Sequence, residues 1–321
     1  MLKVYDCSNS SERPTTRGFG GSVTNEFVAE LHIKSRQHNV LFINDKHRAD
    51  VIFTNDIFPR WACQKSQIRV KRADGIFWQK ILQPRNIPSI LAIAQAHTTI
   101  FISNYSKAAY EALYSSANTR QFVIHHWMRP PGQFPKHTLQ NARPVNLLAM
   151  ATNWNRPEKR FSALRQFARL FPSTKILLVG IPPQEDIPEN IYPCGYLDTT
   201  SPRFLSLAAS CDAFLNLTCK DAATKTVCVA TNLGLPTLYS CSGGVGELVG
   251  SFGHGIYEYD KIEILDEVPQ LQDQHILEGY DIFCKQYQLL HERIAKTDVK
   301  EIYEAKISAY FEAIKKTCNA N

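Results

Sequence analysis

The chain has 321 residues, 44% of them hydrophobic, with a net charge of +6 and a pI near 8.8. This length exceeds one typical domain and suits two α/β domains. The modest basic excess is compatible with a phosphorylated ligand or an acidic membrane surface, but no run of five like charges occurs, which argues against nucleic acid as a partner.

The nine cysteines form no CxxC pair, so the sequence predicts reduced thiols in a cytoplasmic location rather than a disulfide framework or a zinc site. The N-terminus lacks the apolar segment of a signal peptide, and no apolar run reaches the roughly 18 residues of a membrane-spanning helix. Peripheral contact of a basic face with a membrane stays open, as does the oligomeric state.

The first half of the chain alternates short apolar runs with helical patterns. Strands are expected at 2–7, 39–44, 49–55, 68–78, 98–104 and 121–127, and helices at 24–36 and 107–116. Such alternation is typical of a parallel sheet covered on both faces. A segment with four prolines follows at 128–144, and it is interpreted as a linker between domains.

The alternation then restarts. Strands are expected at 145–152, 175–180, 190–196, 212–218 and 236–241, helices at 159–170, 202–210 and 227–233 and from 246 onward, and mostly helix from 274 to 317. The pattern predicts an α/β protein with two Rossmann-like domains facing across a cleft and a helical C-terminal tail. The predicted domains are 1–140, completed by a helix at 300–321, and 141–299.

Three loops of the second half could bind a charged or hydroxylated ligand. Asn153, Arg156 and Lys159 follow a strand and lead into a helix, whose N-terminus favours anions. Asp221 and Thr224 follow another strand and could hydrogen-bond a polyol, whereas the alternative is a capped loop. The third loop holds Gly243, Gly244 and Glu247; its glycines could expose N–H groups to phosphate or could merely form a tight turn.

The first half offers weaker candidates. Gly20 and Gly21 precede a predicted helix, but their spacing is not the dinucleotide fingerprint G-x-G-x-x-G, so a loop facing the cleft is expected there. Asn55 and Asp56 end one predicted strand, and Asp74 precedes Gly75, where an ordinary turn is the alternative.

Together these motifs resemble the GT-B glycosyltransferases, particularly the retaining, nucleotide-sugar-dependent family four (glycosyl transferases group 1). "IRVKRADGIFW" is similar to the V-x-R-x-D-G-x-x-W strand of that group, and "GLPTLYSCSGGVGELV" to its "GTPVIASDVGGIPEIV". Lys159 falls on the lysine that contacts the donor diphosphate. Trp154 replaces the usual arginine five residues earlier, so Arg156 is the substitute.

The resemblance implies transfer of a sugar from a UDP- or GDP-linked donor to a glycan, protein or lipid acceptor, with retention and with neither metal nor prosthetic group. Residues 1–140 would bind the acceptor and 141–299 the donor. The implied roles are catalytic for Asp221, Asn55 and Asp56, donor-binding for Asn153, Arg156, Lys159, Thr224, Gly243, Gly244 and Glu247, and acceptor or cleft loop for Gly20, Gly21 and Asp74.

One departure concerns the E-x7-E pair of the family. Its first acid falls on Asp221, but its second, which grips the nucleotide ribose, falls on Val229. A catalytically inactive sugar-nucleotide-binding protein is therefore one alternative. An NAD(P)-dependent oxidoreductase on two Rossmann domains is another, against which the missing dinucleotide fingerprint argues.

Overall fold

The computed structural model describes residues 1–9, 29–55, 57–59, 61–62, 67–114, 120–131 and 141–319. The chain divides into two compact units. Unit 1 comprises Met1–Trp127, Ile262–Ile264 and Glu301–Asn321, and unit 2 comprises Met128–Lys261 and Leu265–Lys300. The described parts of the proline-rich segment, 128–131 and 141–144, belong to unit 2.

Unit 1 is built on a six-stranded parallel sheet in the order β2-β1-β3-β4-β5-β6. Strands β3 and β5 are buried along their whole length. Helices cover both faces of the sheet, so neither face of these strands is exposed to solvent. The strand order reverses between β1 and β3. The strands are β1 Leu2–Asp6, β2 Val40–Phe42, β3 Val51–Thr54, β4 Ile68–Ala73, β5 Thr98–Phe101 and β6 Arg120–Val123.

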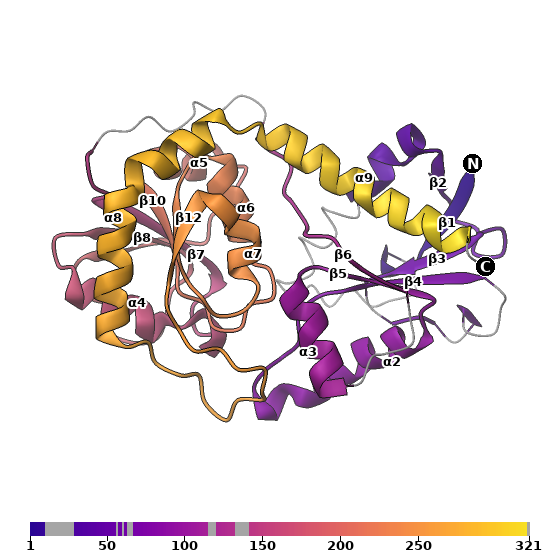
Figure 1. Ribbon diagram of the computed structural model, residues 1–321, viewed down its shortest axis with the longest axis horizontal. Helices are drawn as coiled ribbons and strands as arrows, with labels where there is room; N and C mark the ends of the chain where they lie inside the picture. The colour runs from indigo at the N-terminus through magenta and orange to yellow at the C-terminus, as the bar shows by residue number, and fades with distance from the viewer. Residues whose placement is uncertain are drawn as a thin grey trace. The chain divides into compact units, whose positions relative to one another are not determined.

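The helices of unit 1 lie on both sides of this sheet, with α9 on one side and α2 and α3 on the other (Figure 1). Helix α9 comes from the far end of the chain, yet its Tyr303, Ile307, Tyr310, Phe311 and Ile314 are buried in unit 1. The helical segments are η1 Cys7–Asn9, 29–34, η2 Ser35–His38, η4 Lys80–Asn86, α2 Ile87–Gln95, α3 Asn104–Tyr114 and α9 Val299–Cys318.

Unit 2 is built on a second six-stranded parallel sheet, in the order β12-β11-β10-β7-β8-β9. Its first strand, β7, therefore lies in the middle, and the chain reverses direction of winding between β7 and β10, as in the doubly wound nucleotide-binding folds. The strands are β7 Asn146–Asn153, β8 Lys175–Ile181, β9 Ile191–Gly195, β10 Ala213–Asn216, β11 Thr237–Ser240 and β12 Gly253–Ile256.

In unit 2, α4 and α8 lie on one side of the sheet and α6 and α7 on the other (Figure 1). Phe161, Leu164, Phe167 and Ala168 form the apolar face of α4 that the sequence pattern predicts, and all four are buried against β-strands and α8. The helical segments are η5 Pro157–Lys159, α4 Phe161–Leu170, α5 Pro202–Ala209, α6 Lys225–Asn232, α7 Val245–Val249, η6 Gly250–Phe252 and α8 Asp273–Lys296.

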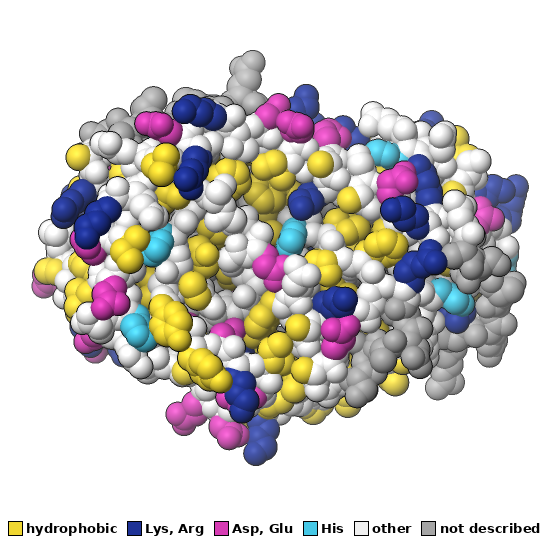
Figure 2. Space-filling model, in the orientation of Figure 1, with side chains coloured by type: hydrophobic (Ala, Val, Ile, Leu, Met, Phe, Trp, Pro, Cys, Tyr) yellow, Lys and Arg dark blue, Asp and Glu magenta, His cyan; other side chains and the backbone are white. Residues whose placement is uncertain are grey.

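The predicted α/β class, with two Rossmann-like halves and a helical C-terminal tail, is confirmed. Among the residues that the structure describes, no helix is both long and apolar enough to cross a membrane. Figure 2 shows basic and acidic side chains interspersed over the face in view.

Candidate functional site

The candidate site lies where the sheet of unit 2 reverses its winding. Strands β7 and β10 are neighbours there, and the loops that leave their carboxyl ends bring Lys159 and Asp221 together. Lys159 Nζ donates to Asp221 Oδ2 at 2.7 Å, with the two side chains 15% and 17% exposed. Open α/β sheets bind their ligands at this position, outside the carboxyl ends of the strands.

Two buried side chains, Trp154 and Arg160, fix the segment between β7 and α4. The buried Trp154 donates from its Nε1 to the carbonyl oxygen of Val179 at 3.0 Å. Arg160 adopts a left-handed conformation (φ 52°), and its buried guanidinium makes a two-pronged hydrogen bond to Glu258. Burial opposes the charge of Arg160, but the bonds to Glu258 prevail and raise its pKa. Arg160 therefore has a structural role, and it is not available to a ligand.

Arg156 and Asn153 lie beside Lys159 and have partners within the same loops. The Arg156 side chain is 48% exposed and forms an ion pair with Glu158. Asn153 Oδ1 accepts from the backbone N–H of Asn155 at 2.9 Å, and Asn155 in turn bonds the loop after β8 through the carbonyl oxygen of Pro182. Arg156 is thus the more accessible cation, while Asn153 shapes the end of β7.

The glycine loop packs closely on the loop that carries Asp221. Gly244 N–H donates to the Asp221 carbonyl oxygen at 2.8 Å, and Gly243 N–H donates to Asp260 Oδ2 at 2.7 Å. Gly243 has φ +80°, and a Cβ there would lie 2.3 Å from the Asp221 carbonyl oxygen, so only glycine permits this approach. Both N–H groups are engaged inside the protein, and these two glycines hold the loops together.

Two acids that the sequence analysis missed support this arrangement from the segment after β12. Asp260 binds Gly243 N–H and also accepts from the buried Lys220 Nζ at 2.8 Å, whereas Glu258 binds Arg160 and Ser240. The signal was the alternation Tyr257-Glu258-Tyr259-Asp260, with the tyrosines exposed and the acids turned inward. It was missed because β12 itself was not predicted.

The remaining predicted donor residues lie at the starts of two helices. Thr224 is the residue before α6, it is buried, and its Oγ1 lies 2.8 Å from Thr226 Oγ1. Glu247 is half-buried in the first turn of α7. Val229, at the position of the missing ribose-binding acid, is half-buried on α6.

Asn55 and Asp74 belong to unit 1. The backbone N–H of Asn55 donates to Ser8 Oγ at 3.0 Å, which places Asn55 where the first sheet reverses between β1 and β3. The Asp74 carboxylate pairs with the buried Arg72 at 2.6 Å. Gly20, Gly21 and Asp56 lie outside the described residues.

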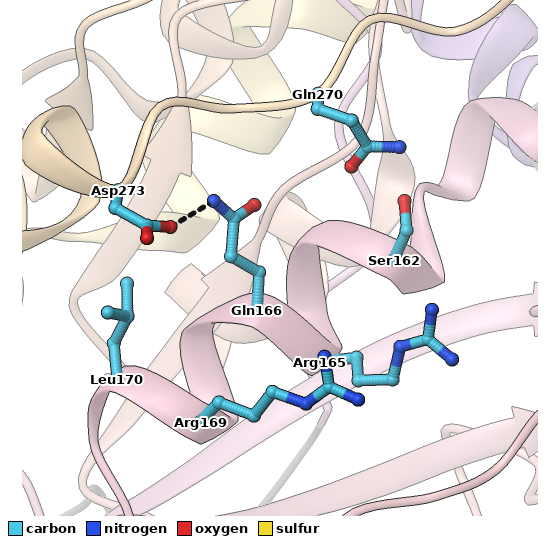
Figure 3. Close-up of a pocket in the computed structure, with 7 residues that line it drawn as sticks. All are labelled: Ser162, Arg165, Gln166, Arg169, Leu170, Gln270 and Asp273. Carbon is cyan, nitrogen blue, oxygen red and sulfur yellow. Dashed lines mark hydrogen bonds between the residues drawn. The ribbon is translucent and has the colours of Figure 1, made fainter.

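A cavity of about 360 Å³ lies against α4, and none of the predicted donor residues lines it. Gln166 points from α4 toward Asp273 at the start of α8 and bonds its carboxylate (Figure 3). Gln166 also donates to the carbonyl oxygen of Leu271 at 2.9 Å, so this contact ties α4 to α8. The cavity is lined by Ser162, Arg165, Gln166, Arg169, Leu170, Gln270 and Asp273.

No protein-family model matches this sequence, and no curated protein matches it either. Solved structures do. The chain superposes on sucrose-phosphate synthase from Thermosynechococcus elongatus with a TM-score of 0.63 at 14% identity, covering 96% of this chain and 81% of that one. HepE from Anabaena, solved with UDP and glucose, gives a TM-score of 0.56 at 12% identity over 100% of both chains.

The GtfA/B complex also matches, with a TM-score of 0.55 at 12% identity over 84% of this chain. This chain spans 57% of the length of that relative. These similarities, together with the two parallel sheets and the C-terminal helix packed in unit 1, identify the fold as GT-B, as the sequence resemblance predicted.

Proposed function

We propose that this protein is a glycosyltransferase that moves a sugar from a nucleotide-sugar donor to a glycan, protein or lipid acceptor. The observation that carries the proposal is the Lys159–Asp221 pair at the reversal point of the unit 2 sheet. A cation and a carboxylate lie side by side there, and a nucleotide sugar needs both. Its diphosphate needs positive charge, and its sugar hydroxyls need a hydrogen-bond acceptor. The structures of HepE with UDP and with UDP-glucose support a nucleotide-sugar ligand on this fold.

In the proposed reaction the bond between the anomeric carbon and the diphosphate oxygen breaks. The acceptor hydroxyl oxygen bonds to that carbon and passes its proton to the departing diphosphate, and the configuration is retained. Lys159 and Arg156 stabilise the charge that develops on the leaving diphosphate. Because these two side chains supply that positive charge, we propose that transfer requires no metal ion, and activity in a chelator is the check.

We assign the sugar side of the site to Asp221, Thr224 and Glu247. Asp221 would exchange its ion pair with Lys159 for the sugar hydroxyls once the diphosphate engages the lysine. Asn153, Gly243 and Gly244 would contribute by shaping the loops. Unit 1 would bind the acceptor, with catalytic roles proposed for Asn55 and Asp56 and acceptor-binding or cleft-loop roles for Asp74, Gly20 and Gly21.

A second candidate is a protein that binds nucleotide sugars without transferring them. Two observations favour it: Val229 leaves the ribose without its usual acid, and the N–H groups of Gly243 and Gly244 are already engaged. Binding without turnover on any donor would select this candidate. Binding of NAD(P) instead of sugar nucleotides would select the oxidoreductase alternative.

Lys159→Ala tests the donor site. We expect it to weaken UDP or GDP binding at least about tenfold, because one charge-assisted contact to the diphosphate is lost, and to abolish slow release of nucleotide from the matching sugar donor. Calorimetry measures the first quantity and a coupled nucleotide assay the second. Lys175→Ala is the matched control, since Lys175 is exposed at the opposite, amino end of β8.

Unchanged binding and turnover in Lys159→Ala would refute the assignment of the diphosphate site. Equal losses in both lysine variants would instead indicate a general effect of net charge. A thermal-shift screen with UDP, GDP, CMP and their sugars identifies the donor, because a ligand that binds only the folded state raises the Tm.

A further inference from the structure

The segment formed by η4 and α2 in unit 1 has its polarity reversed. Gln83 and Asn86 point inward: Asn86 Nδ2 donates to the Phe77 carbonyl oxygen at 2.9 Å and to the hydroxyl of Tyr114 on α3 at 2.9 Å. Gln83 Nε2 also donates to the Phe77 carbonyl oxygen, at 2.6 Å. Ile81, in contrast, points outward and is 86% exposed. Polar groups are satisfied inside while an aliphatic side chain faces water.

The exposed apolar side chains form one continuous row. In a 3-10 helix, residues three apart lie on one line. Ile81 and Pro84 of η4 are therefore aligned with Ile87, the first residue of α2. Helix α2 continues the line four residues further to Leu91, and Ile87 and Leu91 are 52% and 55% exposed. We call this row the η4–α2 ridge, consisting of Ile81, Pro84, Ile87, Pro88 and Leu91, all exposed.

The opposite face of α2 is apolar as well. Ala92 and Ile93 are 1% exposed, and Ala92 belongs to a core cluster with Ile52 of β3. The helix is therefore apolar on both faces, although within the described part of unit 1 only the Ala92–Ile93 face is buried. A helix of this composition is normally buried on both sides, by protein or by lipid.

The charges around the ridge indicate what covers it. Lys80 and Arg85 are exposed within the same segment, and no Asp or Glu occurs between Asp74 and Glu111. A two-fold contact between two copies of this segment would place these cations against a segment that carries no acid, which disfavours self-association. An anionic bilayer supplies both an apolar interior and negative headgroups.

We propose that the η4–α2 ridge is a docking surface for an anionic membrane, with Ile81, Ile87 and Leu91 entering the headgroup region and Lys80 and Arg85 meeting lipid phosphates. Helices α2 and α3 lie on the side of the unit 1 sheet opposite α9 (Figure 1). The surface is independent of the donor site, so the proposal stands or fails separately from the transferase activity.

The test is cosedimentation of the full chain with vesicles of phosphatidylcholine alone or with about one-third phosphatidylglycerol. We expect binding to the anionic vesicles that weakens with added salt. Ile81→Ser/Leu91→Ser should weaken it at least about tenfold through lost apolar burial. Lys80→Gln/Arg85→Gln should weaken it about 30-fold at low salt, at roughly a factor of five per charge.

The control is Ile33→Ser/Leu289→Ser, which removes two exposed aliphatic side chains, 65% and 48% exposed, outside the ridge. This control should bind as the unsubstituted protein does, and all variants should keep its Tm. No binding by the unsubstituted protein, or equal losses in the ridge and control variants, would overturn the proposal. A dimer in solution that Ile81→Ser/Leu91→Ser dissociates would overturn it too, since the ridge would then be a subunit interface.

Discussion

At the scale of single residues, the Lys159–Asp221 pair presents a competition. The Asp221 carboxylate holds the Lys159 ammonium at 2.7 Å, and it must release the ammonium before the ammonium can bind a phosphate. Under the proposed function, Asp221 therefore opposes binding of the nucleotide diphosphate and also contributes to the chemistry of the sugar. The two effects predict opposite responses of binding and turnover to one substitution.

Asp221→Asn should bind UDP or GDP about fivefold more tightly, because removing an ion pair worth about 1 kcal/mol frees Lys159. Turnover of the sugar donor should fall. Calorimetry gives the affinity, and the coupled nucleotide assay gives the rate. Asp186→Asn is the control, because Asp186 is an exposed acid whose loss changes net charge equally. Weaker nucleotide binding in Asp221→Asn would show that the carboxylate contributes to binding rather than opposing it.

The loops that carry this pair could be predicted because each follows a strand with a strong apolar pattern. The roles of Glu258 and Asp260 could not be predicted, since they depend on contacts with Arg160 and Lys220, which lie 98 and 40 residues away along the chain. The pattern likewise identified the glycine loop but not its partners: the N–H groups expected to face phosphate bind Asp260 and the Asp221 carbonyl oxygen. The spacing of residues in the sequence predicts where loops lie, whereas tertiary contacts decide which N–H groups remain free to bind a ligand.

At the scale of elements, His97 extends the hydrogen bonding between β4 and β5, because it precedes β5 and bonds the backbone of Arg69 on β4. His97 Nδ1 accepts from the Arg69 backbone N–H at 2.9 Å, and the His97 backbone N–H donates to the Arg69 carbonyl oxygen at 2.9 Å. Burial, aided by the charge of Arg69, lowers the pKa of His97 below its ordinary value of 6.5. Protonation would replace the Nδ1 acceptor with a second donor facing the N–H.

Unit 1 should therefore lose stability as the pH falls. The folded-state pKa of His97 lies below 6.5, so the stabilisation is complete above that pH and is lost as the pH falls through 6.5 and then through the folded-state pKa. His97→Asn keeps an acceptor near Nδ1 but cannot titrate. Its Tm should depend less steeply on pH between about 5 and 7 than that of the unsubstituted protein. Parallel Tm profiles would contradict this role.

Two elements that the sequence failed to predict, β12 and α2, lack the apolar periodicity on which such a prediction depends. Strand β12 has the sequence Gly-His-Gly-Ile, whose two glycines carry no side chain to produce an apolar alternation. Helix α2, Ile-Pro-Ser-Ile-Leu-Ala-Ile-Ala-Gln, is apolar on both faces and so lacks helical periodicity. The other strands were predicted, within a few residues, because a buried parallel strand is a short apolar run bounded by polar loops.

At the scale of the whole molecule, α9 completes a unit that begins at the other end of the chain. Tyr310 of α9 is buried, and its hydroxyl accepts from Nε of the buried Arg72 on β4 at 3.2 Å. Tyr310→Ala should lower the free energy of unfolding of unit 1 by about 3–5 kcal/mol through the cavity it leaves. Tyr310→Phe, which fills that volume but removes the hydroxyl, should cost about 1–3 kcal/mol.

Urea denaturation measures both variants. Trp61, Trp78 and Trp127 belong to unit 1 and only Trp154 to unit 2, so tryptophan fluorescence reports mainly on the affected unit. Tyr192→Ala, at an exposed position of β9, should leave the transition unchanged. Equal stability of Tyr310→Ala and the unsubstituted protein would show that α9 is dispensable for unit 1.

The position of α9 also sets an order of events during synthesis. Unit 2 has all of its residues by position 300, whereas unit 1 needs residues 301 onward, so the first half of the chain emerges from the ribosome well before its last helix does. Until then, Arg72 and the sheet face that α9 covers lack their partner. The sheet made first is therefore completed last, and a sheet face that stays uncovered during synthesis exposes apolar surface that favours aggregation.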